Sequence, residues 1–192
     1  MQSKFLTGKT NIEKFNENCC IVLNDGSTEN LDDLKDNNVY VIKRKVSYSR
    51  FDTMVPLHIE LKDCLIENNL SSDYVVMMST NQLIIKKGLY DFIKNYKASY
   101  YDREIDSGCI RHLKNNNIFK KYYDEIGEEN FQFQSNHDGM FFEYKIFMDM
   151  INYFADFREI KLDFHGEEFL YVAYLLKNVK KENMINFEHY NY

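Results

Sequence analysis

The sequence has one proline, no tryptophan and four cysteines in 192 residues, and it has no long hydrophobic run. No apolar stretch approaches the roughly 20 residues that cross a bilayer, so we expect no membrane span. The single proline excludes a collagen-like chain. The first residues, Met1 to Phe5, lack the apolar segment of a secretory signal peptide. We therefore expect a cytoplasmic protein with reduced thiols.

Basic residues are also fewer than acidic residues. The chain carries 24 Lys and Arg against 30 Asp and Glu, a net charge of −6. Nucleic-acid binding depends on neutralising phosphates, so this balance argues against a nucleic-acid partner. With 44% hydrophobic and 28% charged residues, the composition is that of a folded globular protein. We expect one domain over residues 1–192, long enough to bury a core.

Several functional motifs are missing. The cysteines form no C-x-x-C pair and no histidine stands at zinc-ligand spacing, so we predict no metal site. The chain has no P-loop, no G-x-G-x-x-G and no G-x-S-x-G motif, which argues against the enzyme classes that use them. It has no Asp-x-Asp pair either. The 15 Tyr and 15 Phe accompany much Asn, Lys and Ile, as in proteins of AT-rich genomes, so we interpret these aromatic residues as core.

The segments that are present alternate between strand and helix patterns. Apolar and β-branched runs predict strands at residues 20–23, 39–42, 73–78 and 139–142. Apolar residues at helical spacing predict helices at residues 51–68, 88–96, 110–126, 145–154 and 167–176. A β-α-β-α-β beginning predicts an α/β domain with a mostly parallel sheet flanked by helices.

Polar loops follow three of these strands, and ligands of parallel sheets bind at the carboxyl ends of strands. Asp25, after the first strand, would accept hydrogen bonds from a base or ribose, or would belong to a capped turn. Lys43 and Arg44, after the second strand, would meet a diphosphate, or would form a solvated strand end. Ser79 and Asn81 follow the third strand.

Three carboxylate-rich segments are candidates for a general base. Residues 102–106 form an acidic loop with the character of a solvated surface. Asp138 and Gly139 precede a predicted strand. Glu167 and Glu168 open the last predicted helix, where a carboxylate acts either as a base or as a partner of the helix dipole.

Taken in order, these segments resemble glycosyltransferases of the core-2/I-branching β-1,6-N-acetylglucosaminyltransferase type and related bacterial and viral proteins. The resemblance extends from about Cys20 to Leu176. It is carried by four segments: Asn38 to Arg44; Asp73 to Ser79, where the family has D-Y, two hydrophobic residues and L-S; Gly139 to Phe142; and Gly166 to Leu170, which is similar to the family's P-D-E helix start.

This resemblance implies a nucleotide-sugar-binding α/β domain of the GT-A type, which inverts the anomeric centre and works without a metal ion. The missing Asp-x-Asp pair agrees with that, because Ser79 and Asn81 stand where the metal ligand usually lies. The family's catalytic base corresponds to Glu168, with Glu167 in the preceding Asp position. The co-substrate is a nucleotide sugar, with no resident cofactor.

The resemblance also implies two groups of substrate contacts. The nucleotide contacts are expected from Asp25, Lys43, Arg44, Ser79 and Asn81, and the acceptor contacts from Asp138, Gly139 and Glu167.

The family's Arg and Lys for the diphosphate lie on a C-terminal stretch for which this chain has Lys180 and Lys181, so these two lysines are an alternative to Lys43 and Arg44. Either residues 1–7 supply the family's first strand, or the domain is truncated relative to the family.

Three other functions stay open at this point. One is a non-catalytic GT-A-like module in a glycan-assembly complex. The second is a metal-dependent transferase that uses Asp102 and Glu104 as ligands. The third is an α/β scaffold without a small-molecule site.

Overall fold

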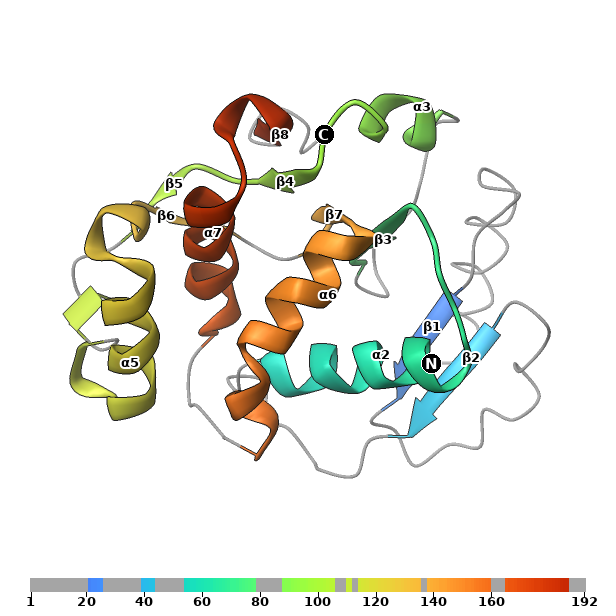
Figure 1. Ribbon diagram of the computed structural model, residues 1–192, viewed down its shortest axis with the longest axis horizontal. Helices are drawn as coiled ribbons and strands as arrows, with labels where there is room; N and C mark the ends of the chain where they lie inside the picture. The colour runs from blue at the N-terminus through green and yellow to red at the C-terminus, as the bar shows by residue number, and fades with distance from the viewer. Residues whose placement is uncertain are drawn as a thin grey trace.

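The computed structural model describes residues 21–25, 39–43, 54–78, 88–105, 110–111, 114–135, 138–159 and 165–186, which form a mixed α/β structure (Figure 1). Its α-helices are α2 (Val55–Glu67), α3 (Leu89–Ile93), α5 (Asn117–Ile126), α6 (Tyr144–Tyr153) and α7 (Glu167–Asn178). Short 3₁₀ helices are η2 (Glu128–Asn130), η3 (Ala155–Glu159) and η4 (Lys181–Asn183). The strands are β1 (Ile21–Asp25), β2 (Val39–Lys43), β3 (Tyr74–Val76), β4 (Ala98–Tyr100), β5 (Arg103–Glu104), β6 (Phe133–Gln134), β7 (Phe141–Glu143) and β8 (Met184–Asn186).

The beginning of the fold confirms the predicted parallel pair. β1 and β2 run parallel in a two-stranded sheet, with Ile21 opposite Val39 and Asp25 opposite Lys43. The carboxyl ends of both strands therefore lie at one edge. Helix α2, which begins with Pro56 in its first turn, packs on both strands and, elsewhere along its length, on α6 and η3 (Figure 1).

The four-stranded sheet shows that the prediction of a mostly parallel sheet was wrong. Its order is β3-β7-β4-β8, and β7 runs antiparallel to both β3 and β4, whereas β4 and β8 are parallel. The chain between β3 and β7 includes α3, β4, β5, α5 and β6. The turn at residues 138–140, at the end of this stretch, sets the direction in which β7 enters the sheet.

Gly139 makes that turn possible. Its φ of 89° lies in the left-handed region, which a glycine adopts without steric penalty. The Gly139 N–H donates to the Met77 carbonyl at 2.7 Å, and the Met77 N–H donates to the Met140 carbonyl at 2.9 Å. The chain thus enters β7 at the edge where β3 ends, which makes the two strands antiparallel.

The shortest strands were not predicted. β4 and β8 have three residues each, and the antiparallel pair β5 and β6 has two each, too few to show an alternating pattern. The predicted strand at residues 73–78 exists as β3, but its three residues are half-buried and not fully buried as expected. β3 ends the sheet in the described part of the chain, which leaves it less covered than a central strand.

Aromatic side chains fill the core, as predicted. Tyr122, Phe142, Phe154, Phe157 and Tyr171 are all at most 1% exposed. Tyr122 stacks on Phe157 with ring centroids 5.1 Å apart and meets Phe154 edge-on at 5.2 Å. Each such ring buries on the order of 150–250 Å², so the five rings together bury on the order of 1,000 Å² of mostly apolar surface.

The long helices follow the predicted apolar spacing, with shifted ends. The predicted helix at residues 110–126 is interrupted at Asn116. Ile110, Arg111, Lys114 and Asn115 are helical, and α5 begins at Asn117 with Asn116 as its N-cap. The Asn116 side-chain oxygen accepts hydrogen bonds from the N–H groups of Ile118 at 3.0 Å and Phe119 at 3.2 Å. Among the helices of the described residues, none combines the length and apolarity needed to cross a bilayer.

Removal of this cap should weaken the fold measurably. We expect Asn116→Ala to lower the free energy of unfolding by about 1 kcal/mol, because two N–H groups lose their acceptor. Asn117→Ala, one residue further into the helix and exposed, is the matched control and should cost nothing, since alanine favours the helix. Urea denaturation measures both, and equal losses in the two variants would contradict the capping role.

Candidate functional site

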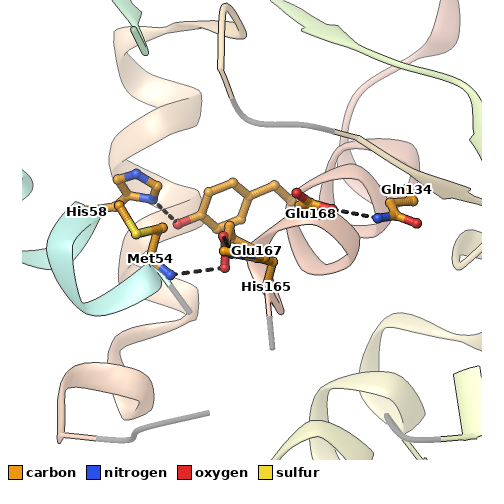
Figure 2. Close-up of polar contacts among 7 residues, drawn as sticks. Met54, His58, Gln134, His165, Glu167 and Glu168 are labelled. Carbon is orange, nitrogen blue, oxygen red and sulfur yellow. Dashed lines mark hydrogen bonds and ion pairs between the residues drawn. The ribbon is translucent and has the colours of Figure 1, made fainter. Parts of the chain in front are cut away.

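Two adjacent glutamates at the start of α7 have different surroundings (Figure 2). Glu167 is fully buried; its Oε2 accepts a hydrogen bond from the Met54 N–H at 3.0 Å, and its Oε1 lies 3.2 Å from His165 Nδ1. Glu168 is half-buried, and its Oε2 accepts from Gln134 Nε2 at 2.5 Å. Figure 2 shows the Glu167 carboxylate directed toward Met54 and the Glu168 carboxylate directed toward Gln134.

Helix geometry explains this difference. Successive side chains of an α-helix point about 100° apart around the helix axis, so neighbouring side chains face different parts of the protein. Glu167 therefore faces α2, and Glu168 faces β6. Both stand in the first turn, where the partial positive charge of the helix N-terminus favours carboxylates. The result is one carboxylate held inside the protein and one beside its surface.

A second contact joins α2 and α7 one turn further along both helices. His58 Nδ1 lies 2.6 Å from the Tyr171 hydroxyl, and both side chains are buried. Burial, and then the negative charge of Glu167, raise the pKa of Tyr171 well above its usual value, so this phenol stays protonated at neutral pH. Met54 and His58 thus face Glu167 and Tyr171 in matching positions.

Ser135 connects Glu168 with the neighbouring strands. The Ser135 N–H donates to the Glu168 carbonyl at 2.8 Å, and the Ser135 hydroxyl donates to Met140 Sδ at 3.4 Å. The same hydroxyl accepts from the Tyr101 N–H, just past β4, at 2.8 Å. The Met140 carbonyl accepts from the Met77 N–H, so the main chain of Glu168 is linked through Ser135 and Met140 to the carboxyl end of β3.

The predicted nucleotide contacts are only partly described. Asp25 and Lys43 end β1 and β2, and their backbones stand opposite each other in the parallel pair. Arg44, Ser79 and Asn81 lie outside the described residues. The roles of all five stay predictions.

The predicted acceptor contacts are described. Asp138 is half-buried in the turn before β7, next to Gly139, whereas Glu167 is fully buried. Of the alternative diphosphate residues, Lys181 lies with Nζ 6.0 Å from the Phe133 ring centre, and Lys180 is exposed. Asp138 and Gly139 lie in the turn just before Met140, which contacts Ser135 beside Glu168, and their roles stay predictions.

The alternative metal ligands, Asp102 and Glu104, lie just after β4. Asp102 is half-buried and Glu104 is exposed. Within the described ranges, no group of three or more His, Cys, Asp and Glu side chains is arranged to hold a metal ion.

A surface hollow in the described part of the chain lies elsewhere. It has a volume of about 410 Å³ and is lined by Ser72, Asp73, Tyr74, Tyr90, Lys94, Glu143, Tyr144 and Lys145. Because Tyr74 pairs with Glu143 at one end of β3 and β7, while Met77 meets Gly139 at the other, this hollow is at the far end of these strands from Glu168. No predicted site residue lines it, so we place the candidate site at Glu168.

Sequence reasoning missed the residues that support the two glutamates. Met54 and His58, like Glu167 and Tyr171, are four residues apart and so share one helix face, a signal that the sequence does contain. Their pairing across 113 residues is not visible in the sequence. Gln134 carries no recognisable local pattern.

Searches of family models, of curated proteins and of solved structures each gave no match to the chain.

Ser135 should matter for stability because it supports the site from within. We expect Ser135→Ala to lower the free energy of unfolding by about 1–3 kcal/mol, since the Tyr101 N–H loses a buried acceptor. Ser72→Ala removes an exposed hydroxyl that donates to the Tyr74 carbonyl and should change stability by less than about 0.5 kcal/mol. Chemical denaturation of both variants checks this, and similar small effects would argue against the role of Ser135.

Proposed function

We propose that this protein is a nucleotide-sugar-dependent glycosyltransferase that inverts the anomeric centre without a metal ion. The observation that carries the proposal is the position of Glu168. Glu168 is half-buried at the start of α7, and its main-chain carbonyl is linked through Ser135 to Met140, next to the carboxyl end of β3 and the turn that holds Asp138 and Gly139. These are the segments that the sequence resemblance assigns to the donor, the acceptor and the base.

In the proposed reaction Glu168 acts as the general base. One of its oxygens takes the proton of an acceptor hydroxyl while that hydroxyl oxygen attacks the anomeric carbon of the donor. A new carbon–oxygen bond forms, the bond from the anomeric carbon to the diphosphate breaks, and the nucleoside diphosphate leaves with the electron pair. The attack from the opposite face inverts the configuration.

Gln134 supports this role. Its side-chain Nε2 donates a hydrogen bond to Oε2 of Glu168. Among the described contacts of this carboxylate, that is the hydrogen bond made by a side-chain oxygen. That hydrogen bond orients the carboxylate and leaves Oε1 for the acceptor proton. A general base must lie within hydrogen-bond reach of the proton that it removes, so a fixed orientation favours the transfer.

The leaving diphosphate needs fixed positive charge. Helix N-termini often bind phosphates, but at α2 a buried carboxylate, that of Glu167, already accepts from the Met54 N–H. The proposal therefore assigns the diphosphate to basic side chains, either Lys43 and Arg44 or Lys180 and Lys181. Asp25 would bind the nucleoside.

Glu168→Gln tests the base directly. We expect kcat to fall by about 10²- to 10⁴-fold, because the amide cannot accept the acceptor proton. The fold should be unchanged, since the amide oxygen still accepts from Gln134. Release of nucleoside diphosphate from the donor measures turnover, and circular dichroism checks the fold.

Glu129→Gln is the matched control, because Glu129 is an exposed glutamate in the first turn of η2. It should keep the activity of the unaltered protein. Near-normal turnover by Glu168→Gln would show that Glu168 is not the base.

Donor binding is tested by thermal unfolding with UDP-, GDP-, CMP- and dTDP-sugars, each with EDTA and with Mn²⁺. A donor at about 100 times its Kd stabilises by about 2.7 kcal/mol, which raises the midpoint by several degrees in a chain of this length. We expect one nucleotide class to give this rise equally in EDTA and in Mn²⁺. A rise that needs Mn²⁺ would favour a metal-dependent transferase, and no rise with any donor would favour a non-catalytic module.

A further inference from the structure

The N-terminal turns of α2 and α7 are joined by two hydrogen bonds, one turn apart. The first runs from the Met54 N–H to Oε2 of Glu167, and the second joins His58 Nδ1 and the Tyr171 hydroxyl (Figure 2). Each step of four residues along α2 is matched by a step of four along α7. The two helices therefore meet in a fixed register, through side chains that are buried at this contact.

Glu167 supplies a hydrogen-bond acceptor to an N–H group at the start of α2. Met54 is the N-cap residue of α2, and no side chain of its own caps the helix. The first N–H groups of a helix have no partner within the helix and need one from elsewhere. The carboxylate of Glu167 supplies an acceptor from a residue 113 positions away.

The environment of Glu167 also explains how a carboxylate is accommodated inside the protein. A buried carboxylate is unfavourable unless hydrogen bonds and positive charge offset its lost hydration. Oε2 receives the Met54 N–H at the positive end of α2, and Oε1 faces the His165 ring. Both oxygens are thus engaged with protein groups, and the side chain is 0% exposed.

We propose that Glu167 is a positioning residue for the base Glu168 and does not bind the sugar. This inference rests on the proposed function. Glu167 and Glu168 are adjacent, so the anchor on α2 fixes the first turn of α7 from one side. The Ser135 N–H holds the Glu168 carbonyl from the other side at 2.8 Å. The backbone that carries the base is therefore held between α2 and β6.

The same anchor relates the base to the strands predicted to bind the nucleotide. α2 packs on β1 and β2, at whose carboxyl ends Asp25 and Lys43 stand. A contact between the start of α2 and the start of α7 therefore sets the base relative to that pair of strands. Misplacement of a reacting group by about 1 Å can lower a rate by about 10²-fold, so such an anchor would affect kcat.

Two variants of Glu167 separate positioning from other roles. Glu167→Gln keeps an oxygen for the Met54 N–H and an amide for His165, and we expect its kcat to stay within about threefold of the unaltered protein. Glu167→Met keeps the length and the buried volume but has no oxygen. We expect its kcat to fall by about 10²-fold, with the KM values of donor and acceptor nearly unchanged.

Amide hydrogen exchange at Met54 tests the anchor without any turnover. The Met54 amide should be protected in the unaltered protein and in Glu167→Gln, and should exchange faster in Glu167→Met. Ile93→Ala serves as the stability control, because Ile93 is a buried residue of α3, the helix whose Tyr90 and Lys94 line the hollow at the far end of β3 from Glu168. Assayed well below its unfolding temperature, Ile93→Ala should keep its kcat, which would show that lost stability alone does not lower turnover.

The positioning role would be overturned if the kcat of Glu167→Met stayed within about twofold of the unaltered protein, or if Glu167→Gln and Glu167→Met lost kcat equally. A rise in the acceptor KM with kcat unchanged would also overturn it, because that result would mark a sugar contact. If Glu167→Met fails to fold, Glu167→Ala takes its place. If the unaltered protein transfers no sugar from any donor, the proposed function fails and the positioning role fails with it, whereas the Met54 exchange rates still report whether Glu167 caps α2.

Discussion

The buried carboxylate of Glu167 is the interaction on which the arrangement of the candidate site depends. It accepts from the Met54 N–H at the start of α2 and faces His165 on its other oxygen. α2 packs on β1 and β2, whereas α7 packs on α5 and β6. One hydrogen-bonded carboxylate therefore links an early segment of the chain to a late one. Because a buried carboxylate must keep its partners, the start of α7 has little freedom to move relative to α2.

The same geometry gives the neighbouring glutamate, Glu168, different surroundings. A helix turns by about 100° for each residue, so the anchor at Glu167 directs Glu168 toward β6, where Gln134 and Ser135 hold its side chain and its carbonyl. Two identical side chains thus acquire different capacities from their surroundings, one enclosed and one beside the surface. A base needs this second environment, because it must meet a substrate.

The antiparallel direction of β7 also contributes to the site. Had β7 run parallel to β3, the turn at residues 138–140 would lie at the opposite end of the strands from Met77. Because β7 is antiparallel, Gly139 bonds to Met77, and Asp138 comes to the edge of the sheet where Ser135 and Glu168 lie. The resemblance to core-2/I-branching glycosyltransferases predicted one site for these segments and a mostly parallel sheet. The parallel sheet was wrong, and the common site stays a prediction.

Local patterns in the sequence by themselves determined the elements whose residues repeat over several turns or along a strand. β1, β2, α2, α6 and α7 were predictable for that reason, as was the placement of Glu167 and Glu168 at a helix start. Only the tertiary structure decided the direction of β7, the three-residue strands β4 and β8, and the pairing of Met54 and His58 with Glu167 and Tyr171. Periodicity reports which face of a segment is apolar, whereas pairing between segments depends on contacts between residues far apart in the chain. Gln134 and Ser135 show this most clearly, because nothing in their own neighbourhood distinguishes them until folding brings α7 beside β6.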